Sequence, residues 1–164
     1  MRVNELKKKS NRRVAVSYIQ ALGIQTYGSD NLYPQVLRDI ISASSTGCEC
    51  VERYADFIEG NGFREVPFSE YVVNRRGDTS DDIHSLICKD VAMYDGLALH
   101  VNYNVNGDIV ELQHIPFENC RLLEEDSNGY MAKIVVHPDW TGKKTRNGKA
   151  ILVKKEFMDY IDVF

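Results

Sequence analysis

The dipeptide Asn106-Gly107 lies between two runs of β-forming residues, and this pattern constrains the fold more than any other feature of the chain. In residues 97–105 every second side chain is apolar or aromatic, and residues 108–115 are also rich in Ile, Val and Leu. Asn-Gly can occupy the two positive-φ positions of a type I′ turn, whose twist matches that of the strands it joins. Pro116 has no N–H for a ladder, so we expect it to end the second strand or lie at an edge. The sequence therefore predicts a β-hairpin with a two-residue turn.

Counting outward from this turn gives the register of the hairpin. His100 is expected opposite Gln113, and Leu99 opposite His114, which places the two histidines on opposite faces of the sheet. A metal shared by these histidines is therefore disfavoured, and the four histidines of the chain show no zinc-like spacing.

Helices are predicted before the hairpin. The turn Gly28–Pro34 precedes the first helix, with Asp30 or Asn31 as its cap and Pro34 in its first turn. The second helix is expected to begin after Ser45 or Thr46 and to end at Gly60. Because the link between them is short, the two helices should form an antiparallel or steeply crossed pair.

A third predicted helix leads directly into the hairpin. It runs from about Thr79 to Tyr94, with Thr79 or Ser80 as its cap and Gly96 closing it. The preceding residues 63–78 are mixed in character and are predicted to be a short extended piece or a loop.

Further strands are predicted after Pro116, at Asn119–Leu123, Tyr130–His137 and Ala150–Lys154. The predicted fold class is therefore α+β, with N-terminal helices followed by an antiparallel β-meander around the Asn-Gly hairpin. Residues 28–164 are expected to form a single domain. Because the chain stops on apolar and aromatic residues, we expect it to be truncated at its C-terminus.

Composition narrows the functional class. The 164 residues are 43% hydrophobic and 27% charged, as in a soluble globular protein. No apolar run approaches the roughly 20 residues needed to cross a bilayer, so a membrane partner is not expected. The net charge of −4 argues against the whole chain being an electrostatic trap for nucleic acid.

Basic residues are nevertheless clustered. Residues 1–27 are predicted to be a basic, partly mobile N-terminal arm, and residues 138–148 form a second polar and basic stretch. The candidates for nucleic-acid or partner contacts are Lys7, Lys8, Lys9, Arg12, Arg13, Lys143, Lys144 and Arg146. No aromatic residue interleaves with the charges of residues 1–13, so base stacking has no support there.

The chain lacks the common sequence motifs of catalytic and nucleotide-binding sites. The chain has no phosphate-binding Gly-x-x-x-x-Gly-Lys-Ser/Thr loop, no Gly-x-Gly-x-x-Gly motif and no Gly-x-Ser-x-Gly elbow. The four cysteines form no Cys-x-x-Cys pair and are interpreted as reduced, buried thiols. Arg75-Arg76 is interpreted as part of a solvated loop, in preference to an anion clamp. No catalytic, cofactor or metal residue is therefore predicted, and the chain is not expected to be an enzyme.

Four stretches taken together resemble the N-terminal part of the portal proteins of tailed bacteriophages and prophages of gut bacteria. They are Asp30–Pro34 before a helix, Ile58–Phe63 at the end of the next helix, Asp90–Val101 running into the hairpin, and Ile115–Leu122. The similarity covers roughly Gly28–Leu123, and it is carried by the order and spacing of the stretches.

The resemblance implies a structural role in the wing region of a portal, without chemistry of its own. In full-length relatives the subunits form a ring, usually of twelve, at one capsid vertex, and DNA passes through it during packaging and ejection. The implied partners are other portal subunits, the capsid and terminase proteins, and the implied location is the virion or, during assembly, the host bacterial cytoplasm. The stem and clip of a complete portal are absent from these residues.

Two alternatives stay open. A small metal-dependent phage nuclease or hydrolase would require carboxylates such as Glu111 and Glu118 beside a metal. A free-standing prophage adaptor domain would bind protein partners only, and an open sheet edge or an apolar patch on the last segment would favour it.

Overall fold

The computed structural model describes residues 17–19, 23–28, 30–125, 127, 131–140 and 159–162. The helices are α1 (Tyr33–Ala43), α2 (Ser45–Glu59), α3 (Val66–Ser69) and α4 (Ser80–Tyr94), with a 3-10 turn η1 (Phe117–Asn119). The strands are β1 (Ser17–Ile19), β2 (Ile24–Thr26), β3 (Leu99–Tyr103), β4 (Ile109–His114), β5 (Cys120–Leu122), β6 (Lys133–Val136) and β7 (Asp159–Asp162). The predicted α+β class is confirmed.

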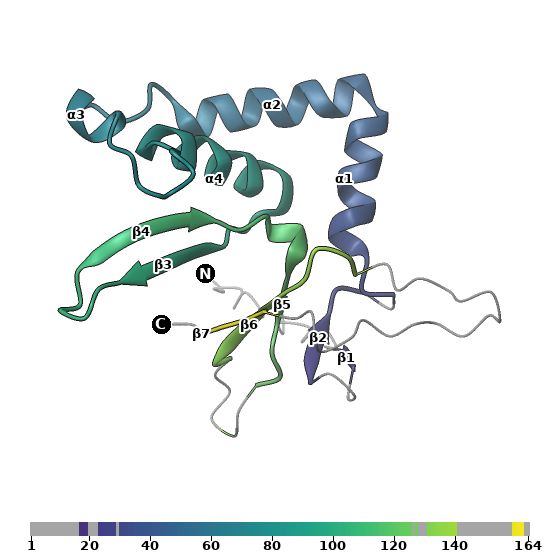
Figure 1. Cartoon of the computed structure of the whole chain (residues 1–164). Coiled ribbons are helices and arrows are strands. Elements are labelled where there is room, and N and C mark those ends of the chain that lie inside the picture. Colours follow the sequence, from purple (N-terminus) through teal and green to yellow (C-terminus); the bar gives the residue numbers. More distant parts are fainter. Residues whose placement is uncertain are drawn as a thin grey trace, which may run out of the picture.

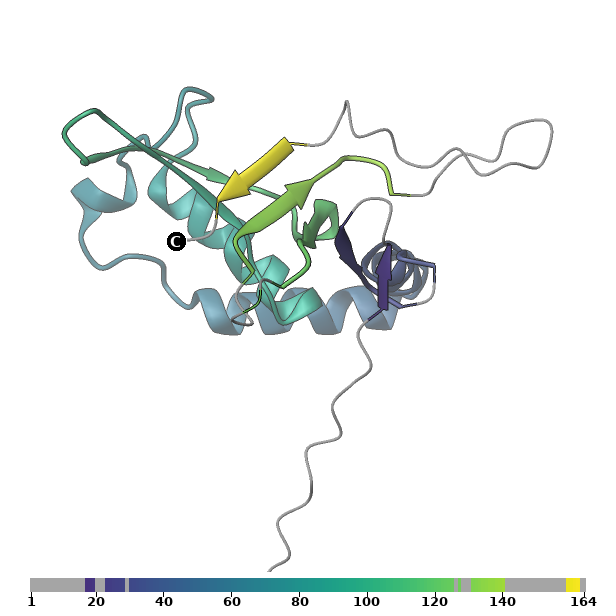
Figure 2. The same ribbon diagram turned by 90° about the horizontal axis from the view of Figure 1, so that it is seen from below.

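The strands do not form one meander, contrary to the prediction. β1 pairs with β2, β3 with β4, and β5, β6 and β7 form a third antiparallel sheet. In Figure 1 the hairpin of β3 and β4 projects to one side below α4, while the β5-β6-β7 sheet and the β1-β2 pair lie further down. Figure 2, seen from below, shows the hairpin projecting to the same side. Pro116 and η1 separate β4 from β5, so the chain leaves the first sheet before it enters the next.

The hairpin has the predicted register at its base but a different turn. His100 is paired with Gln113 and Leu99 with His114, as expected, whereas the register shifts between Asn102 and Tyr103. Gly107 has a positive φ of 87° and Asn106 does not, so the two-residue type I′ turn is wrong. The Asn104 side chain explains this turn, because its Oδ1 accepts from the backbone N–H groups of Asn106 and Asp108 and stabilises a longer loop.

The first two helices are steeply crossed, as predicted, because Ser44 alone separates them (Figure 1). Ser44 caps α2 by accepting from the N–H of Gly47, and Gly60, with φ of 62°, ends it. The predicted cap of α1 is wrong, since Leu32 occupies the N-cap position without a side-chain hydrogen bond. Asn31 lies one residue earlier with φ of 61° and is buried. Pro34 does lie in the first turn.

The segment between α2 and α4 is more regular than the predicted loop. It contains the short helix α3 and an antiparallel bridge between Val72 and Thr79. Asn74 organises its turn, because its Oδ1 accepts from the N–H groups of Arg76 and Asp78. The turn lies against β4, where the N–H of Leu112 donates to the carbonyl of Val73.

Helix α4 begins with the predicted Thr79 cap, which forms a reciprocal capping box with Asp82. Its C-terminus differs from the prediction, because Asp95 with φ of 55° takes the left-handed position instead of Gly96. Gly96 has another use. A Cβ atom on Gly96 would lie 2.6 Å from Cε2 of the Phe117 ring, so only glycine allows the ring to approach the backbone this closely.

Gly96→Ala is expected to lower the free energy of unfolding by about 1–3 kcal/mol, because the new methyl group overpacks the Phe117 contact. Urea denaturation monitored by circular dichroism measures this. A double-mutant cycle with Phe117→Leu should show positive coupling, since the smaller side chain leaves room for the methyl group. Additive effects of the two substitutions would contradict the proposed steric cause.

The buried residues form a core among the strands and a layer between α2 and α4. Ile24, Val135 and Trp140 form the first, with Leu32 and Leu123 packed against them. Ala55 of α2 and Ile83 and Cys88 of α4 are buried in the helical layer. Within residues 1–27, β1 pairs with β2, and Ile24 of β2 is fully buried.

Candidate functional site

Arg121 of β5 is the largest fully buried side chain among the described residues. Its Nε donates to Oδ1 of Asn31 at 2.6 Å, and its Nη2 donates to the carbonyl of Asn31 at 2.7 Å and to Oε1 of Gln35 at 3.1 Å. Its Nη1 donates to the carbonyls of Glu118 at 2.8 Å and Cys120 at 2.7 Å. The five contacts match the five N–H groups of a guanidinium, so its hydrogen-bonding capacity is used within the chain.

Two aromatic rings enclose the same guanidinium. Its Cζ lies 4.9 Å from the centroid of Tyr27 and 4.8 Å from that of Trp140. Burial lowers the pKa of Arg121 to about 10, which still leaves the group charged near neutral pH. The cation is thus stabilised by neutral acceptors and π faces, an arrangement that compensates part of the cost of removing it from water.

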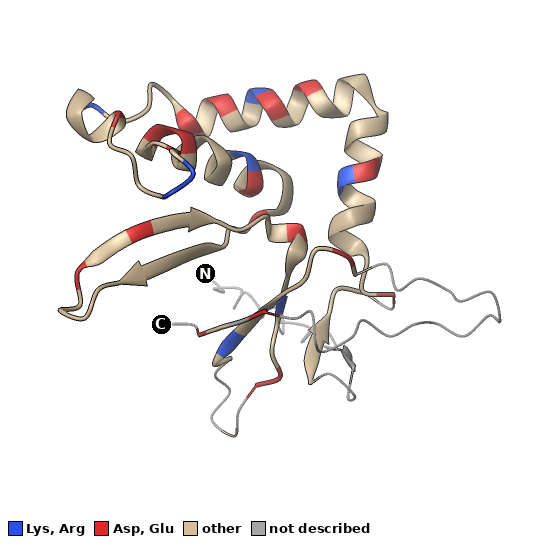
Figure 3. Cartoon of the chain, in the orientation of Figure 1, with Lys and Arg blue, Asp and Glu red and all other residues tan. Residues whose placement is uncertain are grey.

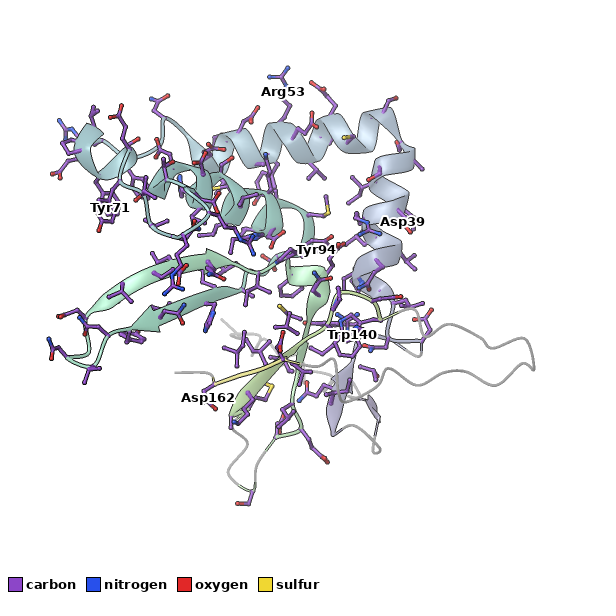
Figure 4. All side chains as sticks on the ribbon, in the orientation of Figure 1. Asp39, Arg53, Tyr71, Tyr94, Trp140 and Asp162 are labelled. Atoms are coloured by element: carbon purple, nitrogen blue, oxygen red, sulfur yellow. The ribbon has the colours of Figure 1, made fainter. Side chains whose placement is uncertain are left out.

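Arg121 joins segments that are distant in the sequence. Asn31 and Gln35 belong to the start of α1, Trp140 follows β6, and Arg121 itself lies on β5. Trp140 and Tyr94 are both found in the region where α1, η1 and the β5-β6-β7 sheet meet (Figure 4). We call Tyr27, Asn31, Gln35, Arg121 and Trp140 the Arg121 joint.

A second polar cluster fixes α4 to the start of η1. Asp90 accepts from the N–H of Phe117 at 3.0 Å, and its carboxylate lies 2.8 Å from Nε2 of His114. Tyr94 donates from its hydroxyl to Glu118, and burial together with the Glu118 charge raises the pKa of Tyr94. Asp90 and Tyr94, both on α4, therefore hold η1, the turn between the β3-β4 hairpin and the β5-β6-β7 sheet, in place.

The two carboxylates that the nuclease alternative required lie in separate clusters. Glu111 accepts from Gln113, from the backbone N–H of Arg75 and from Asn102, and these hydrogen bonds hold its pKa below the usual range. Glu118 accepts instead from Arg38 and Tyr94. The two carboxylates share no hydrogen-bond partner, and in the described part of the chain no group of three or more His, Cys, Asp or Glu residues is arranged to hold a metal ion.

A hollow of about 1040 Å³ separates the β3-β4 hairpin from the β5-β6-β7 sheet. Its lining includes Val101, Ile115, Ile134 and Ile161 together with His100, His114, Asp159 and Asp162. His114 is already paired with Asp90, and Asp162 forms an ion pair with Lys133 at 3.0 Å. The hollow therefore combines apolar side chains with the exposed carboxylates of Asp159 and Asp162.

The eight basic residues that the sequence singled out lie outside the described residues. They are Lys7, Lys8, Lys9, Arg12, Arg13, Lys143, Lys144 and Arg146. Their role stays a prediction.

Other residues singled out earlier are placed by the structure. Arg75 and Arg76 are exposed, and their backbone N–H groups bind Glu111 and Asn74. All four cysteines are free, but the prediction that they are buried holds only for Cys88 and Cys120. Burial raises the pKa of Cys120 to about 12, which makes its thiol unreactive near neutral pH.

Sequence reasoning missed the Arg121 joint, although two signals were present. Arg121 lies between Cys120 and Leu122 in a predicted strand, where a cation among apolar neighbours requires buried partners. Trp140 is the single tryptophan of the chain and follows a strand directly. Neither signal identifies Asn31 as the partner, because the two segments are 90 residues apart.

The comparisons with known proteins returned no relative. No protein-family model matches the chain, and neither a curated protein nor a solved structure matches it. Within the described residues, no helix combines the length and the apolar character needed to cross a bilayer.

Proposed function

We propose that this chain is a structural, non-catalytic part of a portal-type ring protein of a tailed bacteriophage or prophage, corresponding to the N-terminal part of the wing. One observation carries the proposal. Three of the four stretches that resemble portal proteins contact one another: Asn31 binds Arg121, and Asp90 binds the N–H of Phe117. The residues behind the resemblance thus serve to hold the fold together.

Buried and half-buried polar side chains form hydrogen bonds within the chain, and this supports a structural role. The side chains of Asp90, Glu111, Glu118 and Arg121 make hydrogen bonds inside the chain, and each connects elements of the fold. A hydrolase instead needs such groups to converge on a substrate or a metal. A full-length protein of this class would contact other copies of itself, capsid and terminase proteins, with DNA passing through the ring.

A free-standing adaptor domain is the second candidate. β7 is an outer strand of the β5-β6-β7 sheet within the described part of the chain, and the hollow lies beside it. An outer strand offers main-chain groups to a partner strand, which suits a protein whose function is binding.

Sequencing the reading frame beyond the codon for Phe164 in the source DNA separates the two candidates. A portal requires the frame to continue for hundreds of codons and to encode long amphipathic helices for a stem. An immediate stop codon would contradict the portal proposal and leave the adaptor. Thermal melting with and without millimolar Mg²⁺ or Mn²⁺ tests the nuclease alternative, because a bound metal raises the melting temperature by mass action. We expect no shift.

A further inference from the structure

Charge is divided unevenly between the described part of the chain and the residues before it. The described residues contain 8 Lys and Arg against 21 Asp and Glu, so their formal net charge is −13. Residues 1–16 contain six Lys and Arg and one Glu, which gives +5. Figure 3 shows that acidic residues outnumber basic ones along α2, α4 and the hairpin. A basic segment and an acidic body in one chain attract each other, within one copy or between copies.

The outer face of α2 combines acidic and aromatic side chains. Glu49, Glu52 and Asp56 are exposed on it, and they are accompanied by Tyr54 and Phe57, whose exposed fractions are 54% and 82%. Ala55 is the buried residue of α2, on the side that packs on α4, and Glu52, three residues earlier, lies at the border of that side. We call Glu49, Glu52, Tyr54, Asp56 and Phe57 the α2 face.

One cation lies among these residues. Arg53 points away from the body of the molecule (Figure 4) and forms an ion pair with Glu49 at 2.9 Å. The side chains of Arg53 and Glu49 are both largely exposed, so this ion pair is weak, and the α2 face keeps a net negative charge. Tyr54 and Phe57, three residues apart on the helix, are neighbouring exposed aromatic side chains, and a partner polypeptide that covers them would bury their apolar surface.

The position of α2 favours a second copy as the source of the basic segment. The described chain begins at β1, which lies at the other end of the molecule from α2 (Figure 1). Sixteen extended residues reach at most about 58 Å, at about 3.3–3.6 Å per residue. A reach of this length is enough for residues 1–16 of one copy to meet the α2 face of a neighbouring copy.

We propose that residues 1–13 of one copy bind the α2 face of a second copy. Lys7, Lys8, Lys9, Arg12 and Arg13 would meet the carboxylates, while Val3 and Leu6 supply apolar contact for Tyr54 and Phe57. Because the two contacting surfaces differ, the contact is head-to-tail and propagates to a ring or a filament. The inference deepens the proposed ring function and rests on it for the closure of the ring.

Two variants with reversed charges, one in residues 1–13 and one in the α2 face, test the proposed contact between copies. The arm variant carries Lys7→Glu, Lys8→Glu and Lys9→Glu, and the face variant carries Glu49→Lys, Glu52→Lys and Asp56→Lys. Sedimentation velocity of the 164-residue chain should show at least twice the monomer mass of 18.7 kDa in about 0.1 M salt. In about 1 M salt, where the Debye length falls from about 10 Å to about 3 Å, the mass should return to that of the monomer.

Each variant alone is expected to stay monomeric in low salt, since its arm and its face then repel each other. An equimolar mixture of the two should restore association, because each arm again meets a face of opposite charge. A control variant with Glu65→Lys, Glu70→Lys and Glu124→Lys has the same change in net charge away from α2 and should associate like the unmodified chain. Circular dichroism confirms that all variants are folded.

Several outcomes would overturn the inference. They are a monomeric unmodified chain in low salt, association that persists in the arm variant, and a mixture that stays monomeric. Association that disappears on nuclease treatment would assign the basic segment to nucleic acid instead. None of these results bears on the reading frame beyond Phe164, so the inference and the proposed function can fail separately.

Discussion

Replacing Arg121 by methionine is expected to lower the free energy of unfolding by about 3–5 kcal/mol. The substitution removes hydrogen bonds to Asn31, Gln35 and two backbone carbonyls, and it leaves buried acceptors without partners. Each unpaired buried acceptor costs about 1–3 kcal/mol, partly offset because the cation itself no longer has to be desolvated. The start of α1 would then lose its attachment to β5.

Urea denaturation of Arg121→Met, Arg121→Lys and Arg53→Met measures this effect. Arg121→Lys keeps the charge but offers three donors in place of a planar fork, so we expect it to recover less than half of the loss. Arg53→Met removes an exposed cation on α2 and should change stability by at most about 1 kcal/mol. Equal effects of the substitutions at positions 121 and 53 would contradict the structural role of Arg121.

Local patterns in the sequence predicted most of the elements but not their assembly. The register at the base of the hairpin, the Thr79 cap and the crossing of α1 and α2 all depend on residues close in the sequence. The type I′ turn failed because the Asn104 side chain competes for the backbone of the same loop. Such competition between short polar side chains and backbone turns has no signature in hydrophobic periodicity.

Asn31 shows why the joint itself could not be predicted. Its type and position are typical of a helix cap, but it adopts φ of 61° and directs Oδ1 toward the N–H of Tyr27 and toward Arg121. The Asn31 side-chain amide could either cap α1 or accept a hydrogen bond from a buried donor. Which of the two it does depends on where β5 places Arg121. Asp95 is a similar case, because Asp and Asn adopt left-handed φ more readily than most residues and can replace an expected glycine.

The hydrophobic side of the same joint is tested by Trp140→Ala, which should also lower the free energy of unfolding by about 3–5 kcal/mol. Trp140 is 4% exposed, packs with Ile24 and Val135, and donates from Nε1 to the carbonyl of Asn119 at 2.9 Å. Trp140→Phe should cost less, because a phenyl ring keeps part of the packing and loses the hydrogen bond. Phe57→Ala, at an aromatic residue that is 82% exposed, is the matched control and should change stability by at most about 0.5 kcal/mol.

A double-mutant cycle between Arg121→Met and Trp140→Phe measures how far the two sides of the joint depend on each other. The guanidinium lies 4.8 Å from the centroid of the indole ring, within the range of a cation–π contact. A coupling energy of about 0.5–2 kcal/mol is expected for a desolvated pair of this kind. Zero coupling would mean that Trp140 acts as core packing alone and that neutral acceptors stabilise the buried cation unaided. Positive coupling would make the joint one cooperative unit, so that loss of either residue detaches α1 from the β5-β6-β7 sheet. The start of α1 would then lose its fixed position relative to the strands, whereas α2 would stay packed on α4, which Asp90 and Tyr94 hold at η1.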